Sequence, residues 1–483
     1  MFEENIQIYK LPMEMIIEHG NSVYLTIEMA LLEGWLIPIS NNQLVNKIYD
    51  YYTENSLEDL GIKDAIVNVV VSNAIGRNAQ KVADKYREFA HSGFYLNDRH
   101  YIRLCAGSGQ LRNNTITFVW DVMYDYLTEA LYCGITTEEL GESFSVSKWN
   151  AYLGLSESGV RFLQSAPRVC VVSDYEEIKP HLQIDYIETR TSINRRAKKT
   201  DKVISRHYYD DPETDFAPLN SFDGQGLADP EWMHRVAVEL GYLAKDSGYV
   251  PSEYILRAPW CKGLVVAFDF KAYCRENGVT KLRDVYGKEY SVDGIDILLS
   301  ASQFKLWKIY GKHGGWQYHE DAMKKYNLRW GVVIANKKRD DDYCELNYQY
   351  LQALDLDDAD IDKLCEQTEN MLTNLCNGDV GTTYKTLVGL PSAGDVVNND
   401  QPKAAVSLLQ KTVEHNYELL GDKYIQALIY REAEAKFNGA KIGKLLCRGG
   451  YSFILSDPVA QIQHIIRHHA TDGYRYGSDK RTV

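Results

Sequence analysis

The chain has 483 residues and a net charge of −14, from 53 basic and 67 acidic side chains. Its 45% hydrophobic and 25% charged residues are typical of a globular protein with room for a large core. The acidic balance argues against a protein that coats nucleic acid by charge alone, although a local basic channel can still hold a phosphate backbone.

The first part of the chain, residues 1–95, is expected to be a helical region, because apolar residues recur at helical spacing between 62 and 89. Residues 96–215 are expected to form a linker or slab-like region, with more helical pattern at 118–132 and a short strand at 168–173.

Polar residues dominate the stretch 189–215, where apolar periodicity fades, which predicts a loop or a domain junction. From 216 to 340 short runs rich in Val and Ile are cut by Gly and Asp and interrupted by one helix at about 230–246. This pattern predicts a compact β-barrel or sandwich.

Helical pattern returns over 341–440, which we interpret as a helical neck. Residues 441–483 begin with a predicted two-stranded hairpin at 444–455 and end in an aperiodic tail. The fold class expected from these elements is α+β.

Nine cysteines are scattered along the chain with no CxxC pair, which predicts reduced thiols and a cytoplasmic location. The N-terminal sequence lacks a basic segment followed by an apolar one, so no signal peptide is expected. No stretch approaches 18 uninterrupted apolar residues, so we expect no membrane partner.

A glycine-flanked loop, SGQLR at 108–112, could present Gln110 and Arg112 to a backbone phosphate, although Arg112 could equally form a structural salt bridge. The most concentrated positive segment is a second candidate for nucleic-acid contact, with a solvated loop as the equal alternative. It contains Arg195, Arg196, Lys198 and Lys199.

Two further segments could position phosphate-binding groups. Asp223, Gly224 and Gly226 form a tight turn before a helix that starts at Pro230, although a plain β-to-α turn would look the same. In RAPWCKG at 257–263, a lysine lies between Trp260 and Gly263 at the start of a strand, which would fix an ammonium against a triphosphate. A solvated surface lysine remains the alternative. No P-loop, GxGxxG, HExxH or GxSxG motif is present.

Taken in order, six segments resemble motifs of the RNA-dependent RNA polymerases of RNA silencing and their relatives in phages and mobile elements, a two-barrel polymerase family. The resemblance covers roughly residues 95–465. The segments are SGQLR at 108–112, SKWNAYLGLSES at 147–158, DGQGLADP at 223–230, RAPWCKGLVV at 257–266, SASQFKLWK at 300–308 and NYQYLQAL at 347–354.

This resemblance implies a nucleotidyltransferase that polymerises RNA from nucleoside triphosphates on a nucleic-acid template. It implies a double-psi β-barrel at 216–340 and the start of a second barrel region after 441. Lys262 would face the triphosphate and the growing end, with Arg257 and Lys305 as further contacts. Gln110, Arg112 and the basic segment would lie near the template. The residues implied to shape the turn beneath the lysine are Asp223, Gly224, Gly226 and Gly263.

The chain departs from the family at two places. Ala151 and Leu153 stand in a segment where family members usually carry Arg, so the template could be oriented differently. The family's second barrel carries a DxDGD motif for catalytic Mg²⁺ or Mn²⁺, whereas the acidic run at 355–360 lacks its glycine and the one at 292–296 lies within the first barrel.

We therefore expect a chain that stops before the metal-binding aspartates and lacks their carboxylate triad. A second chain carrying DxDGD would complete the enzyme. The alternatives are a non-catalytic nucleic-acid-binding or scaffold protein and an inactive truncated polymerase. Whether the template is DNA or RNA, and whether a primer is needed, stay open.

Overall fold

The computed structural model describes residues 6–71, 79–107, 114–140, 145–177, 185–193, 200–208, 219–245, 249–336, 343–346, 351, 354–379, 381–383, 386, 415–449 and 452–472. The chain forms two compact units, each made of separate stretches. Unit 1 comprises residues 1–166, 231–262 and 308–454, and unit 2 comprises 167–230, 263–307 and 455–483.

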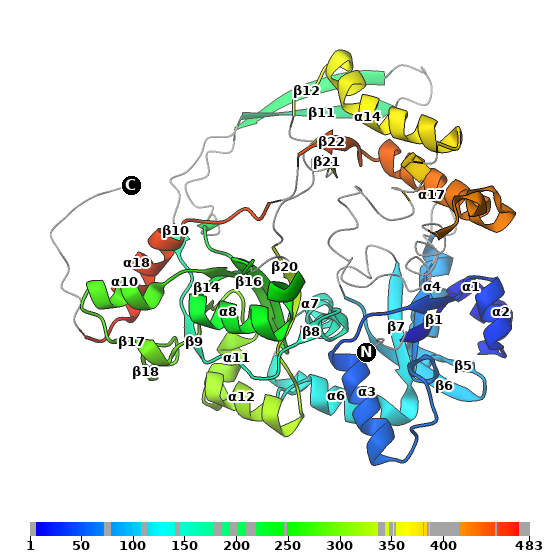
Figure 1. The fold of residues 1–483 in the computed structure, drawn as a ribbon. Helices are drawn as coiled ribbons and strands as arrows, with labels where there is room; N and C mark the ends of the chain where they lie inside the picture. The colour runs from blue at the N-terminus through cyan, green and yellow to red at the C-terminus, as the bar shows by residue number, and fades with distance from the viewer. Residues whose placement is uncertain are drawn as a thin grey trace. The chain divides into compact units, whose positions relative to one another are not determined.

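The N-terminal part of unit 1 is a seven-stranded sheet with strand order β2-β5-β6-β7-β4-β1-β3 (Figure 1). Its central strands β4 and β7 are antiparallel, and β1 runs parallel to β4. The strands are β1 (Gln7–Pro12), β2 (Ser22–Val23), β3 (Leu36–Pro38), β4 (Ile66–Val70), β5 (Phe94–Leu96), β6 (Arg99–Cys105) and β7 (Thr115–Trp120).

An aromatic cluster holds this sheet to the helix that precedes β5. The ring of Phe89, from α4 (Ala79–Ser92), lies 5.6 Å from Phe94 and 5.3 Å from Phe118, and all three side chains are buried. Aromatic pairs at this separation add about 0.5–1.5 kcal/mol beyond the burial of their area.

Helices are present over 1–95 as expected, but strands β1 to β4 lie among them and β5 begins there, so the region is mixed rather than mainly helical. The apolar residues at 62–89 belong to three elements, the 3₁₀ turn η1 (Ile62–Asp64), β4 and α4. Their combined spacing resembles that of one long helix, although only α4 is an α-helix. At 118–132 the expected helix is present only as α6 (Tyr124–Leu131), after β7 and the 3₁₀ turn η2 (Asp121–Met123).

A second part of unit 1 is an antiparallel ladder of β8 (Arg161–Phe162), β20 (Gly331–Ala335) and β15 (Glu253–Ala258). Strand β20, with the sequence GVVIA, is one of the Val- and Ile-rich runs expected between 216 and 340. Helices of this part and of the N-terminal part include α1 (Met13–Glu18), α2 (Ile27–Leu32), α3 (Gln43–Glu54), α7 (Val146–Leu153), α8 (Pro230–Glu239), α9 (Tyr242–Lys245), α11 (Trp307–Tyr310) and α12 (Trp316–Lys325).

In the described residues of 341–440, where a helical neck was expected, the chain forms two long helices, α14 (Asp358–Cys376) and α17 (Lys423–Lys441), and also one short strand, β21 (Tyr343–Glu345). Asp357 caps α14 by accepting a hydrogen bond from the backbone of Asp360 at 2.8 Å. The hairpin predicted at 444–455 is wrong, because β22 (Leu446–Arg448) pairs with β21 instead. Because β21 and β22 are far apart in sequence, no turn motif connects them, and the sequence near β22 does not indicate its partner.

Unit 2 contains four neighbouring strands in the order β16-β14-β19-β9. Strand β14 (Gln225–Ala228) is parallel to β16 (Cys261–Ala267) and antiparallel to β19 (Ile297–Ser300), which is parallel to β9 (Val169–Val172). The strand predicted at 168–173 is confirmed as β9. This mixed pairing, with the helices, agrees with the expected combination of α and β structure.

Two helices cover the core of unit 2, α10 (Phe270–Glu276) and α18 (Pro458–His469), which Figure 1 shows side by side. Phe270, Leu282, Ile462 and Ile465 are buried in one cluster. Leu282 comes from β17 (Lys281–Arg283), which pairs with β18 (Glu289–Ser291). The core thus joins residues of the stretch 170–298 to the helix at 458–469, far along the sequence.

The loop expected at 189–215 is wrong for its described residues. Strands β11 (Asp185–Ile193) and β12 (Thr200–Tyr208) pair along their whole lengths in an antiparallel ribbon. Thr and Ile alternate with polar residues there, and β-branched residues favour strands even where apolar periodicity is weak. The remaining short strands, β10 (Glu176–Glu177) and β13 (Leu219–Asn220), pair with each other.

Candidate active site

The turn between β15 and β16 is held in an unusual backbone conformation by packing. Trp260, the second residue of the turn, has φ of 58°, in the left-handed region that non-glycine residues seldom adopt. Its indole Nε1 donates a hydrogen bond to the carbonyl oxygen of Tyr132 at 3.0 Å, and its ring lies 4.9 Å from that of Trp149. These contacts compensate for a backbone strain of about 1–3 kcal/mol.

A buried histidine holds the other turn residue. Nε2 of His319, on α12, lies 2.9 Å from the carbonyl oxygen of Pro259, so this nitrogen carries the hydrogen and donates it. Burial lowers the pKa of His319 to about 4, and the imidazole is therefore neutral near pH 7. Sequence reasoning missed this residue, because a single histidine in an amphipathic helix carries no motif.

The turn brings two basic side chains to facing positions. Because Pro259 and Trp260 alone separate the two strands, Arg257 at the end of β15 faces Lys262 at the start of β16. Like charges directly opposite on a sheet are destabilising, so folding alone does not favour this pair.

Arg257 is largely removed from water. Burial lowers the pKa of its guanidinium to about 10. Nη1 donates to the carbonyl oxygen of Leu256 at 2.8 Å, whereas the buried Nε has no hydrogen-bond partner among the described residues. Such a group is favourable for an anion with several oxygens, which a guanidinium binds through parallel hydrogen bonds.

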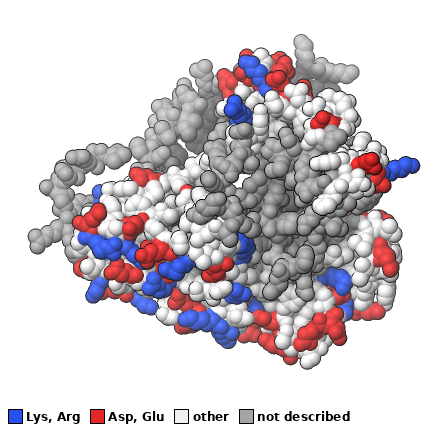
Figure 2. All heavy atoms as spheres, in the orientation of Figure 1, with Lys and Arg blue, Asp and Glu red and all other residues white. Residues whose placement is uncertain are grey.

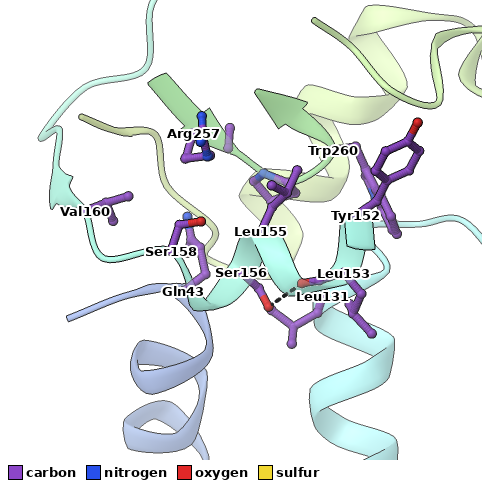
Figure 3. A pocket seen from close by; sticks show the side chains of 12 residues that line it. Gln43, Leu131, Tyr152, Leu153, Leu155, Ser156, Ser158, Val160, Arg257 and Trp260 are labelled. Atoms are coloured by element: carbon purple, nitrogen blue, oxygen red, sulfur yellow. Dashed lines mark hydrogen bonds between the residues drawn. The ribbon is translucent and has the colours of Figure 1, made fainter. Parts of the chain in front are cut away.

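Arg257 and Lys262 line one open cleft of about 590 Å³ within unit 1. Other residues that line the cleft come from the N-terminal sheet and include Lys10 of β1 and Asn68 of β4. Arg257 also borders a smaller hollow lined by Gln43, Ser158, Val160 and the Trp260 ring, which Figure 3 shows. This mostly apolar side explains why the guanidinium is desolvated.

Glu157 supplies the sole carboxylate among the described residues that line the cleft. Its Oε1 accepts a hydrogen bond from Sγ of Cys105 at 2.7 Å and its Oε2 accepts one from Oγ1 of Thr117 at 2.8 Å. Burial, and then the Glu157 charge, raise the pKa of the Cys105 thiol, which keeps its proton for this bond. Both carboxylate oxygens are thus engaged with the protein.

In the parts of the chain that the structure describes, no group of three or more His, Cys, Asp or Glu side chains could hold a metal ion. A pair of divalent cations needs several clustered carboxylates. Glu157, with both oxygens bonded to neighbours, does not fit that requirement.

One glycine of the DGQG segment, Gly226, and the glycine of the KG segment, Gly263, pack against one buried amide in unit 2. Gln303, which is 1% exposed, accepts a hydrogen bond from the backbone of Ser300 and donates one to the carbonyl oxygen of Leu264. A Cβ at Gly226 or Gly263 would overlap its side chain. A side chain at position 226 or 263 is therefore excluded on steric grounds, which the sequence analysis did not predict.

The other predicted residues of unit 2 have local contacts. Gly224 has φ of 73° and its backbone donates to Oγ of Ser302 at 2.9 Å. Asp223 is exposed, and Lys305 donates to the carbonyl oxygen of Ser302. The predicted template contacts Gln110, Arg112, Arg195, Arg196, Lys198 and Lys199 lie outside the described residues.

Charge is not concentrated on the face that Figure 2 shows, where basic and acidic side chains are interspersed over the described surface. No helix in the described residues is long and apolar enough to cross a membrane.

The chain matches no family model. Over 380 residues it is 28% identical to the DNA-directed RNA polymerase YonO of Bacillus phage SPbeta, a match that covers 77% of this chain and 39% of that protein. An RNA-dependent RNA polymerase, QDE-1 from Thielavia terrestris, is a structural neighbour with a TM-score of 0.39 and 13% identity, over 79% of this chain and 38% of that one. The chain thus spans well under two thirds of the length of the curated relative it matches.

Proposed function

Since the chain is related in sequence to the two-barrel RNA polymerases, as its motifs predicted, we propose that it forms part of an enzyme that polymerises RNA from nucleoside triphosphates on a nucleic-acid template. We propose that the unit 1 cleft receives the triphosphate. The facing pair of Arg257 and Lys262, one of them desolvated and incompletely hydrogen-bonded, is the observation that carries the proposal.

The chemistry of nucleotidyl transfer suits these two side chains. Negative charge shifts towards the leaving pyrophosphate in the transition state, and fixed positive groups in a site with little water stabilise it. The planar guanidinium of Arg257 would bind two phosphate oxygens at once, and Lys262 would act as a point charge on the neighbouring phosphate. Their facing positions in two paired strands fix both groups before the substrate arrives.

Mg²⁺ or Mn²⁺ is the ion that we propose for the complete enzyme, where it would activate the attacking oxygen. The described residues do not provide its carboxylates. We therefore propose that a second chain, which carries the DxDGD barrel, supplies them.

The finer assignments from the motifs are proposed on the same basis. Strands β9, β14, β16 and β19 would belong to a double-psi barrel, which the mixed pairing about β14 supports. Lys305 would be a further phosphate contact. Gln110, Arg112, Arg195, Arg196, Lys198 and Lys199 would contact the template.

RNA synthesis with purified protein tests this proposal. The chain is mixed with primed or unprimed single-stranded DNA or RNA, four ribonucleotides and Mg²⁺ or Mn²⁺, with and without a protein that carries the DxDGD barrel. We expect product in the complete mixture and a loss of roughly 10²–10³-fold in rate for Lys262→Ala or Arg257→Ala.

The matched control is Lys312→Ala, an exposed lysine of unit 1 that does not line the cleft, which should keep the wild-type rate. Undiminished synthesis by a folded Lys262→Ala variant would exclude the cleft as the triphosphate site. Nucleic-acid binding with no synthesis in any mixture would instead favour a non-catalytic binding protein.

A further inference from the structure

We infer that His319 is a positioning residue, which fixes the Pro259–Trp260 turn and thereby sets the separation of Arg257 and Lys262. This inference rests on the proposed triphosphate site in the unit 1 cleft. The contact that carries it is the 2.9 Å distance between Nε2 of His319 and the carbonyl oxygen of Pro259.

The turn needs outside support, because its type is poorly suited to a hairpin. Proline at the first central position and a positive φ at Trp260 correspond to a type II turn. Two-residue hairpins favour the mirror-image types, since types I and II splay the strands, and a type II turn favours glycine where this chain has Trp260. The conformation therefore persists only if its surroundings hold it.

The peptide group between Pro259 and Trp260 is the part that decides the turn type. Types I and II differ mainly in the orientation of this central peptide, whose carbonyl lies outside the strand ladder. By donating to that carbonyl oxygen, His319 stabilises one orientation over the flipped one. The indole of Trp260, which donates to Tyr132, anchors the following residue.

The imidazole itself is firmly held. His319 is fully buried, with ring centroids 4.7 Å from Trp316 and 5.1 Å from Tyr310. Tyr310 is fixed in turn by a hydrogen bond from its hydroxyl to the carbonyl oxygen of Cys133 at 2.7 Å. The low pKa of the imidazole keeps it in the neutral form that donates from Nε2. Because the imidazole is held in place, the carbonyl group that accepts its hydrogen bond has little freedom to move.

The separation of the basic pair matters for an anion that contacts both groups. Binding constellations need positions accurate to about 0.5 Å, and a misplacement of about 1 Å can weaken function by roughly 10²-fold. A flipped central peptide would change the splay of the strands at the positions of Arg257 and Lys262. Loss of the His319 donor should therefore weaken anion binding without removing either charge.

The test measures binding of inorganic tripolyphosphate to the full chain by calorimetry, without divalent cations. The key variant is His319→Phe, which keeps a ring but removes the donor, and His319→Gln restores a donor of similar reach. The control is Tyr318→Phe on the same helix, which removes a hydrogen bond from its hydroxyl to the carbonyl oxygen of Gly134 at 2.9 Å. Urea unfolding of each variant gives the accompanying loss of stability.

We expect His319→Phe to weaken tripolyphosphate binding about tenfold, the equivalent of one lost hydrogen bond, and His319→Gln to recover most of the affinity. Tyr318→Phe should bind as the wild type does even at an equal loss of stability. If His319→Phe does not fold, the comparison uses His319→Gln against His319→Asn, whose amide is too short to reach Pro259. Equal affinities for that pair, or an unchanged affinity in His319→Phe, overturn the inference.

The Arg257→Ala and Lys262→Ala variants separate this inference from the proposed function. If the wild-type chain binds tripolyphosphate through both residues and His319→Phe binds equally well, only the positioning role is wrong. If the wild-type chain does not bind, or if both alanine variants bind normally, the proposed triphosphate site and the inference fail together.

Discussion

The side-chain amide of Gln303 occupies the space beside Gly263 that any larger residue there would need. A Cβ at position 263 would lie 2.6 Å from Cγ of Gln303 and 2.6 Å from the carbonyl oxygen of Gly224. Since Gln303 is buried and uses both ends of its amide on backbone groups, it cannot move aside without leaving them unpaired.

Gly263→Ala should therefore destabilise the protein by about 1–3 kcal/mol, the usual range for overpacking. Urea unfolding followed by circular dichroism measures this change. The matched control is Gly294→Ala, where an added Cβ meets nothing within 4 Å, and its effect should stay within roughly 0.5 kcal/mol. Equal stabilities for the two variants would contradict the steric reason given for Gly263.

Arg257→Met should leave stability unchanged or raise it by about 1 kcal/mol, because it removes a desolvated charge and keeps apolar volume. The same change should abolish tripolyphosphate binding. Urea unfolding and calorimetry on one preparation measure both effects.

The control for this prediction is Arg161→Met on β8. Arg161 donates to the carbonyl oxygen of Leu240 and lies 4.8 Å above the Tyr242 ring. Its removal should cost about 1–2 kcal/mol. A loss of that size for Arg257→Met would mean that Arg257 stabilises the fold.

Lys271→Met should destabilise unit 2 by about 3–5 kcal/mol, because it leaves a buried carboxylate without its partner. The ammonium of Lys271 lies 2.9 Å from Oδ2 of Asp229, and their side chains are 12% and 5% exposed. The double variant Lys271→Met with Asp229→Leu should recover most of that loss in the same unfolding assay. Additive losses in the double variant would show that the pair is not coupled.

Acid should destabilise the protein partly through His464. Burial, followed by the charges of His468 and His469, lowers the pKa of His464 from 6.5 to about 4. Because the unfolded chain takes up this proton first, the stabilising contribution is complete above pH 6.5 and is lost as the pH falls towards 4.

His464→Phe, which keeps a ring beside Tyr175, should therefore flatten the dependence of unfolding free energy on pH in this window. The slope should fall by up to about 1.4 kcal/mol per pH unit, the value for one proton. Urea unfolding at several pH values measures it, and parallel curves for variant and wild type would reject the assignment.

Local patterns predicted those elements whose stabilising contacts lie close in sequence. The Val-rich run of β9 and the capped, amphipathic α14 were both read correctly. The pairings of β21 with β22, β1 with β4 and β4 with β7 were missed, because the partners come from distant segments. The β5–β6 hairpin was missed although its strands are adjacent in sequence.

The residues of the candidate site also divide into those that a local motif predicted and those that it did not. The motif resemblance predicted Lys262 as the residue that faces the triphosphate, with Arg257 as a further contact. It did not predict the two-residue turn between β15 and β16 that brings these residues to facing positions. Lys10, Asn68 and Glu157 reach the cleft from other segments, and nothing in their local sequence marks them. His319 was missed for the same reason, because its role depends on one carbonyl group in the turn between β15 and β16.

The division of unit 2 among three stretches of sequence has a consequence for synthesis of the protein. Ile462, Ile465 and Ile466 of α18 close the core around Phe270 and Leu282, which leave the ribosome much earlier. Until α18 emerges, a nascent chain would expose that apolar surface, which chaperones bind and which promotes aggregation. Completion of this core therefore waits for the synthesis of α18, while the N-terminal sheet, whose strands all precede residue 121, can assemble earlier.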